Sequence, residues 1–167
     1  MVIALDPGNE QTAFVLFDTD RRAFNGGWRG RSFGKAPNAD VLDMVQTKAK
    51  HGGMTDRYCV IEMIASYGMP VGAEVFDTCV WIGRFAQVWD GEYRHKAELL
   101  YRREVKLHLC GQPRAKDANI RQSLIDRFGG KAAIKKGGSL YKVSGDVWSA
   151  LAVAVTWSDL RAAEKAA

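Results

Sequence analysis

Three acidic residues stand at the ends of apolar segments, where side chains can take part in chemistry. Asp6 ends the first apolar run of the chain, and Glu62 ends a second one near its middle. Asp146 opens a third apolar segment near the carboxyl end. Carboxylates gathered from three such segments can hold divalent metal ions, and bound ions can activate water for phosphodiester hydrolysis. The pattern therefore predicts a metal-dependent nuclease.

Two of these acids also have ordinary structural interpretations. Asp6 belongs to an Asp-Pro-Gly sequence that is typical of turns, and Asp146 is placed to be an acid in the first turn of a helix. Glu62 is different because a carboxylate at the end of a strand in a mixed sheet commonly faces a functional crevice. Hard oxygen ligands without a cluster of Cys or His favour Mg²⁺ or Mn²⁺ over Zn²⁺.

The segments that must position these acids show strand and helix patterns. Strands are predicted at 2–5, 12–17, near 27–33 and at 58–62, and helices at 38–50, 71–89, 97–106, 116–128 and 146–163. The predicted strands lie mainly in the first half of the chain and the predicted helices mainly in the second. This order predicts an α/β domain with a mixed five-stranded sheet flanked by helices. The 71–89 pattern is apolar on more than one face, so it predicts contact with the sheet and a second subunit, or complete burial within one domain.

Length and composition narrow the class of protein. The 167 residues, 47% of them apolar, are enough for one domain, 1–167, with a substantial core. The cysteines at 59, 79 and 110 are widely spaced and odd in number, which favours reduced thiols in the cytoplasm. No leader segment or membrane-spanning run is expected.

Positive charge is concentrated in one part of the chain. Residues 94–142 contain 13 Lys and Arg against 4 Asp and Glu, although the net charge of the whole chain is only +5. A basic segment beside an acidic remainder suits a protein that binds phosphates with one surface and metal with another. Solvated helix faces are the alternative explanation.

The three acidic segments, in this order, resemble the RuvC group of Holliday junction resolvases. The resemblance runs from Val2 to about Trp157 and rests on an Asp-Pro-Gly strand end leading to Thr-Ala-Phe, a central Ile-Glu strand end, and a final helix with Asp followed by Ala-Leu-Ala-Val-Ala. Size and divergent intervening segments are more similar to a bacteriophage member, which would act in the cytoplasm of a bacterial host. The resemblance implies an RNase H-like fold in which the first strand lies beside the strand that carries Glu62.

The resemblance also implies an activity and roles for particular residues. The expected protein is a homodimeric endonuclease that cuts four-way and other branched DNA, with two Mg²⁺ ions, or Mn²⁺, held by Asp6, Glu62 and Asp146. Lys106 and Lys116 correspond to basic residues near the scissile phosphate, although solvated helix ends are the alternative. The remaining predicted DNA contacts are an aromatic ring at Tyr67, which could instead pack on the next helix, and basic side chains at Arg102, Arg103, Arg114, Lys131, Lys135 and Lys136.

One position departs from the pattern. The family usually has a further acid three residues after the first acid of the last helix, and here that residue is Ser149. The second metal ion is therefore expected to be held less tightly. Three other functions stay open: a nuclease for RNA–DNA hybrids or structured RNA, an actin-like or sugar-kinase-type ATPase, and a catalytically inert protein that binds junctions.

Overall fold

The structure is a computed structural model that describes the chain except residues 22, 25–31, 51–56, 67, 69 and 167. Its strands are β1 (Val2–Pro7), β2 (Gln11–Asp18), β3 (Ala23–Phe24), β4 (Phe33–Pro37), β5 (Tyr58–Met63) and β6 (Glu98–Tyr101). Its helices are α1 (Asn38–Lys50), α2 (Ala73–Glu92), α3 (Arg102–Cys110), α4 (Asp117–Arg127) and α5 (Val147–Ala166), with a short 3₁₀ helix, η1, at Gly130–Ala132.

The strands form one mixed sheet in the order β3-β2-β1-β5-β6, and β4 also pairs with β2. The strand β1 is antiparallel to β2 and parallel to β5, which in turn is parallel to β6. Since β1 takes one edge of β2, the short strands β3 and β4 share its other edge. The predicted mixed sheet is thus confirmed, and it has six strands in place of the predicted five because β3 and β4 both pair with β2. Most of the third strand predicted near 27–33 lies outside the described residues, and within that range only Phe33 belongs to a described strand, β4.

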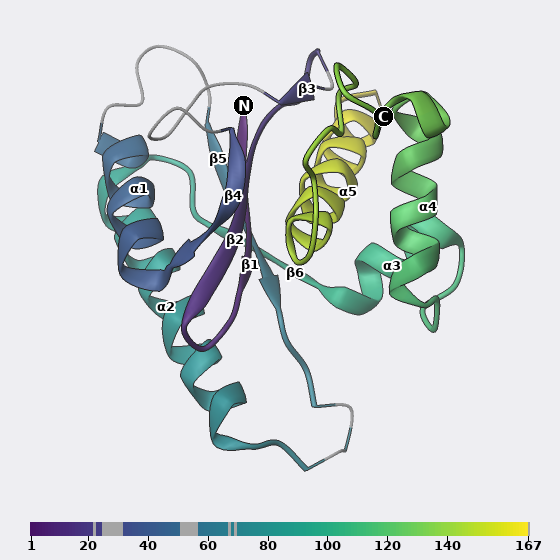
Figure 1. The fold of residues 1–167 in the computed structure, drawn as a ribbon. Coiled ribbons are helices and arrows are strands. Elements are labelled where there is room, and N and C mark those ends of the chain that lie inside the picture. The colour runs from purple at the N-terminus through teal and green to yellow at the C-terminus, as the bar shows by residue number, and fades with distance from the viewer. Residues whose placement is uncertain (22, 25–31, 51–56, 67, 69, 167) are drawn as a thin grey trace.

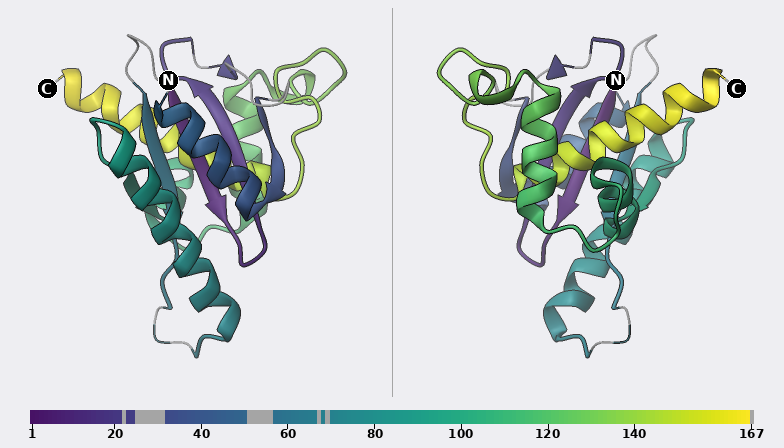
Figure 2. Two further views of the ribbon diagram at one scale, coloured as in Figure 1. Left: turned by 90° about the vertical axis from the view of Figure 1, so that its left-hand side faces the viewer. Right: turned by 90° about the vertical axis from the view of Figure 1, so that its right-hand side faces the viewer.

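Helices cover both faces of the sheet (Figure 1). The side chains of β1 alternate between the faces, as a strand requires. Ile3 and Leu5 pack in the core beneath α1 and α2, whereas Val2 and Ala4 pack in the core beneath α5. Figure 2 shows α5 crossing the strands on the second face, with α4 beside it.

The helix α2 buries only one of its apolar faces. Ile82, Phe85 and Trp89 are buried against the sheet and α1, but Phe76 and Val80 are 62% and 61% exposed. The amino-terminal half of α2 projects beyond the end of the sheet (Figure 2). Complete burial of this helix within one chain is therefore excluded. In the described part of the chain, no helix has the length and apolar character needed to span a membrane.

The prediction of a helix at 97–106 is wrong for the first half of that range. Residues 98–101 form β6 and pair with β5, and α3 begins only at Arg102. The reason is tertiary: the edge of β5 offers backbone hydrogen bonds, and Leu100 becomes buried opposite Glu62. Glu104 then accepts a hydrogen bond from the N–H of Tyr101 at 2.8 Å, which closes the first turn of α3. As a result, Arg102 stands at the same end of the sheet as Glu62.

Candidate active site

Strand register brings Asp6 and Glu62 to one place. Leu5 of β1 lies opposite Ile61 of β5 in the parallel pair, so the two acids that follow them are neighbours. Strand alternation puts Asp6 on the face of Ala4, and Glu62 on the face of Val60, which is the face covered by α5. The predicted proximity of Asp6 and Glu62 is therefore confirmed.

Burial, which is nearly complete for Glu62 and partial for Asp6, opposes the negative charges of the two carboxylates. Burial raises the pKa of Asp6 to about 8, with the negative charge of Glu62 as the next cause and Arg102 acting in the opposite direction. Burial also raises the pKa of Glu62, and the neighbouring Arg102 opposes that change. The side chain of Glu62 is only 6% exposed. Two adjacent acids whose ionisation is opposed in this way favour a bound cation beside them.

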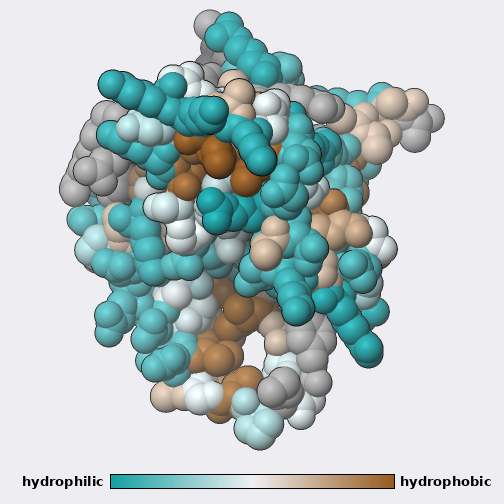
Figure 3. All heavy atoms as spheres, turned by 45° about the vertical axis from the view of Figure 1, so that its right-hand side comes forward, coloured by the Kyte–Doolittle hydropathy of each residue, from teal (hydrophilic) through white to brown (hydrophobic). Residues whose placement is uncertain are grey.

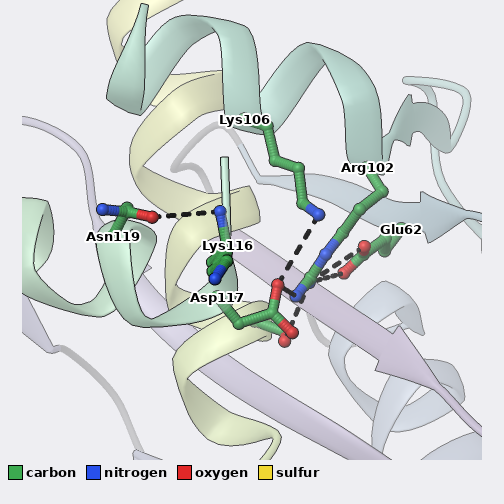
Figure 4. Close-up of polar contacts among 7 residues, drawn as sticks. Glu62, Arg102, Lys106, Lys116, Asp117 and Asn119 are labelled. Carbon is green, nitrogen blue, oxygen red and sulfur yellow. Dashed lines mark hydrogen bonds and ion pairs between the residues drawn. The ribbon is translucent and has the colours of Figure 1, made fainter. Parts of the chain in front are cut away.

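Arg102 supplies a cation to this pair from the start of α3. Its Nη1 donates to Oε1 and Oε2 of Glu62 at 3.1 and 3.2 Å and to Oγ of Ser149 at 2.9 Å. Its Nη2 donates to Oδ1 of Asp117 at 2.8 Å, and Nζ of Lys106 lies 3.7 Å from the same oxygen. Figure 4 shows Arg102 between Glu62 and Asp117, with Lys106 next to it. Hydrogen bonding to Arg102 lowers the pKa of Asp117.

Asp146 stands just before α5 and faces a different partner. Nζ of Lys35, on β4, donates to its Oδ2 at 2.6 Å, with both side chains about half exposed. Its carbonyl oxygen accepts the N–H groups of Ser149 and Ala150, so its backbone begins the helix. Asp146 also contributes to the raised pKa of Asp6. A hollow of about 320 Å³ is lined by both acids and Lys35.

A metal ion fits part of this arrangement. Among the described residues, no three His, Cys, Asp or Glu side chains are placed as a ready group of metal ligands. Asp6 and Asp146 nevertheless line one hollow, and Glu62 adjoins Asp6, so carboxylate oxygens of the kind that Mg²⁺ prefers lie near one another. The Glu62 oxygens that a second ion would share are already hydrogen-bonded to Arg102. The side chains thus fit one divalent ion better than two.

Asn38 fixes the turn that carries Asp6, a role that the sequence did not predict. Its Nδ2 donates to the carbonyl oxygens of Gly8 and Asn9 at 2.9 and 3.0 Å, and its Oδ1 accepts from Oγ1 of Thr12 at 2.6 Å. Both Asn38 and Thr12 are buried. A Cβ at Gly8 would meet the carbonyl oxygen of Gln11 at 2.8 Å, so only glycine fits this tight turn. The buried hydrogen bonds therefore hold the end of β1 in place.

The predicted basic residues lie around two hollows beside the acids. One, of about 750 Å³, is lined by Arg102, Lys131, Lys135, Asp146 and Ser149, with apolar side chains that include Trp148. The other, of about 360 Å³, is lined by Arg102, Arg103, Lys106, Pro113 and Arg114. Figure 3 shows a largely hydrophilic surface with apolar side chains in its depressions.

The other predicted contacts are less closely tied to these hollows. Lys116 is exposed. Its backbone N–H donates a hydrogen bond to Oδ1 of Asn119 at 3.0 Å, as Figure 4 shows. Lys136 is exposed and lines neither hollow. The prediction for Tyr67 falls outside the described residues.

Comparisons with known proteins support the fold. By sequence, no family model and no curated protein matches the chain. Among solved structures, Thermus thermophilus RuvC matches with a TM-score of 0.58 and 14% identity over 97% of this chain and 96% of that one. T. thermophilus RuvC in complex with Holliday junction substrate matches with a TM-score of 0.60 and 16% identity over 93% and 90%. The chain thus has the fold of RuvC, which is the RNase H-like fold that the family resemblance implied.

Proposed function

We propose that this protein is a metal-dependent endonuclease that resolves four-way DNA junctions and cuts other branched DNA. The observation that carries the proposal is the pair of partly buried Asp6 and buried Glu62 at the ends of two parallel strands, with Asp146 beside it and basic hollows adjoining it. The RuvC fold supports it, because one of the similar structures holds a Holliday junction substrate. In the proposed reaction, water attacks the phosphorus and the 3′ oxygen leaves.

The acids and the basic side chains have separate tasks in this proposal. Asp6, Glu62 and Asp146 bind Mg²⁺, or Mn²⁺ in its place, and the family pattern implies two ions per subunit. A bound ion would activate the attacking water and stabilise charge on the leaving oxygen. Lys106 and Lys116 provide positive charge near the phosphate undergoing reaction. The other basic residues hold the DNA backbone without regard to its sequence.

We further propose that the protein acts as a homodimer that uses the exposed face of α2. Gly72, Phe76, Val80 and Gly83 recur at helical spacing, so they share one face, and all four are exposed. Brown, hydrophobic side chains gather at the lower end of the molecule in Figure 3, where this half of α2 projects. A two-fold dimer would place two active sites on one four-way junction and produce paired nicks.

The setting that we propose is the cytoplasm of a bacterial host, with the protein encoded by a bacteriophage. Free cysteines at 59, 79 and 110 are compatible with a reducing compartment. The divergence of the chain between its three acidic segments supports a phage member of the RuvC group.

The main alternative function is cleavage of RNA–DNA hybrids by a nuclease with the same fold. The experiment that separates them compares an immobile four-way junction, an RNA–DNA hybrid of one arm sequence and the matching linear duplex, each with Mg²⁺. We expect the junction to be cut and the two linear substrates to be left largely intact. Faster cleavage of the hybrid would assign the site to hybrid or RNA processing.

A second candidate is a junction-binding protein without nuclease activity. Two contacts favour it: Arg102 neutralises charge at Glu62, and Lys35 is paired with Asp146. This candidate predicts tight junction binding in chelator and no nicks at any Mg²⁺ or Mn²⁺ concentration.

Replacing Lys131 and Lys135 together by glutamine is expected to weaken junction binding and its dependence on salt. Both side chains are exposed and line the larger hollow. If each contacts a phosphate, the slope of log K against log salt should fall by about 1.8 in magnitude, since each contact contributes roughly 0.9. Binding titrations over a range of salt concentrations measure this slope. Lys50→Gln with Lys165→Gln, outside both hollows, is the matched control, and equal slopes in the two double variants would contradict the assignment.

Replacing Gly83 by leucine is expected to weaken dimerisation more than folding. A Cβ at this position meets nothing within 4 Å in the single chain, so the substitution is tolerated within the subunit. On a closely packed two-fold face, the same side chain would push the helices apart. Sedimentation across a dilution series, with circular dichroism for folding, measures both effects. Ala163→Leu, at an exposed position of α5, is the control. An unchanged dissociation constant for Gly83→Leu would exclude this face from the interface.

A further inference from the structure

Arg102 is built into the acidic cluster, although its sequence context suggested a surface phosphate contact. It makes hydrogen bonds to three residues on three different elements: Glu62 on β5, Asp117 on α4 and Ser149 on α5. Its side chain is only 26% exposed. A basic residue that merely attracts DNA from the surface needs none of these contacts. The guanidinium instead fills the space where these three side chains converge.

Ser149 matches a guanidinium better than it matches a metal ion. Its Oγ accepts the N–H of Arg102 at 2.9 Å, which requires a lone pair but no negative charge. A divalent ion at the same place would need anionic oxygens to offset its charge. Glu62 already gives both of its oxygens to Arg102, at 3.1 and 3.2 Å. Neutral Ser149 and cationic Arg102 therefore complement each other.

The other side of the cluster offers carboxylates to a metal ion. Asp6 and Asp146 line the hollow of about 320 Å³ together with the turn that follows β1 and with Lys35, which pairs with Asp146, and neither Arg102 nor Glu62 lines it. Arg102 lines the two basic hollows, so a phosphate held in either would meet its guanidinium. The site thus separates into a region for a divalent ion and a region with a fixed organic cation.

We propose that Arg102 permanently takes the place of one of two divalent ions, so that each subunit binds a single divalent ion through Asp6 and Asp146, with Glu62 adding negative charge from beside Asp6. The proposal rests on the proposed metal-dependent nuclease function and makes it more specific. Arg102 would hold Glu62 in position and present positive charge to the phosphate, as a bound ion would. Ser149 is then neutral because the cation beside it is the Arg102 guanidinium and not a metal ion. The absence of an acid at 149 therefore does not weaken binding of the single divalent ion.

The test is the number of Mn²⁺ ions bound per chain, measured without DNA by calorimetry and by electron paramagnetic resonance on metal-free protein. The wild-type protein is expected to bind one Mn²⁺. The double variant Arg102→Gln with Ser149→Asp, which removes the guanidinium and adds an anionic ligand, is expected to bind two. Arg103→Gln, on the next residue of α3 and exposed, is the matched control and should bind one.

The outcomes separate this inference from the proposed function. Two Mn²⁺ ions in the wild-type protein, or one ion in the double variant, would overturn the role of Arg102 and leave the nuclease proposal intact. Failure of the wild-type protein to bind Mn²⁺ at millimolar concentrations would overturn both. Because the double variant could fold poorly, Arg102→Lys is measured alongside, and it should keep one ion since it keeps the charge.

Thermal unfolding gives a second measurement that distinguishes a replaced cation from a purely structural contact. Arg102→Gln should lower the melting temperature in chelator, because Glu62 and Asp117 lose their shared partner. Mn²⁺ should then raise the melting temperature of this variant more than that of the wild-type protein. A loss in chelator with no extra recovery in Mn²⁺ would show that Arg102 only braces the fold, and would overturn the proposal.

Discussion

Replacing Glu62 by glutamine is expected to abolish junction cleavage while leaving junction binding within a few-fold of the wild-type level. Glutamine keeps the shape of the side chain and one acceptor oxygen for Arg102, but it removes the negative charge that would hold metal. The loss should exceed the roughly 10–100-fold that removal of an outer partner of a metal ligand typically causes. Single-turnover cleavage and binding to the same labelled junction measure the two quantities separately.

The control for Glu62→Gln is Glu164→Gln. Glu164 is an exposed acid of α5 that pairs with Arg161, far along the helix from Asp146. This variant should cut the junction at the wild-type rate. Cleavage at that rate by a folded Glu62→Gln protein in the same Mg²⁺ would remove Glu62 from the active site.

Replacing Asp6 by asparagine is expected to stabilise the protein in chelator, increasingly so as the pH rises from about 4 to 8. The pKa of Asp6 is about 8 in the folded state, against 3.8 for the ordinary carboxyl group. Below pH 3.8 the group is protonated in both states and does not affect stability. Between the two values the unfolded chain loses the proton more readily, so the wild-type fold loses stability with rising pH. Each unit of separation corresponds to about 1.4 kcal/mol, which makes a difference of several kcal/mol by pH 8.

Denaturant unfolding of the two proteins at several pH values tests this expectation. The difference between their free energies of unfolding should widen up to about pH 8 and then level off. Asp43→Asn, an exposed acid of α1, serves as the control and should follow the wild-type curve. Divalent metal should narrow the gap by stabilising only the protein that keeps the carboxylate. Parallel curves for Asp6→Asn and wild type would mean that Asp6 ionises normally in the fold.

Local patterns were enough to predict the two strands that carry Asp6 and Glu62, because 2–5 and 58–62 are rich in apolar residues. The family resemblance, and no local pattern, implied that these strands are neighbours and that the two acids are close together. Helices at 38–50, 116–128 and 146–163 agree with α1, α4 and α5 to within a few residues. These features depend on hydrophobic periodicity and helix signals that are local in the chain.

The contacts that complete the site depend on segments distant in sequence. Arg102 meets Glu62 across 40 residues, and it can do so only because residues 98–101 pair with β5 as a strand. The sequence of that segment is also compatible with a helix, so no local signal places Arg102 in the cluster. Asn38 looked like an ordinary helix start, and its hydrogen bonds to the turn after Asp6 follow from the packing of α1 against the hairpin.

The most direct test of the central proposal is incubation of the protein with an end-labelled immobile four-way junction and a linear duplex of the same sequence, each with Mg²⁺, Mn²⁺ or chelator. The proposal predicts paired nicks at symmetric positions of the junction, only with divalent metal, and little cutting of the duplex. Because the 3′ oxygen is the leaving group, the nicks should carry 3′-hydroxyl and 5′-phosphate ends that DNA ligase reseals. Equal cutting of both substrates, cutting in chelator, or tight junction binding without nicks in either metal would contradict it.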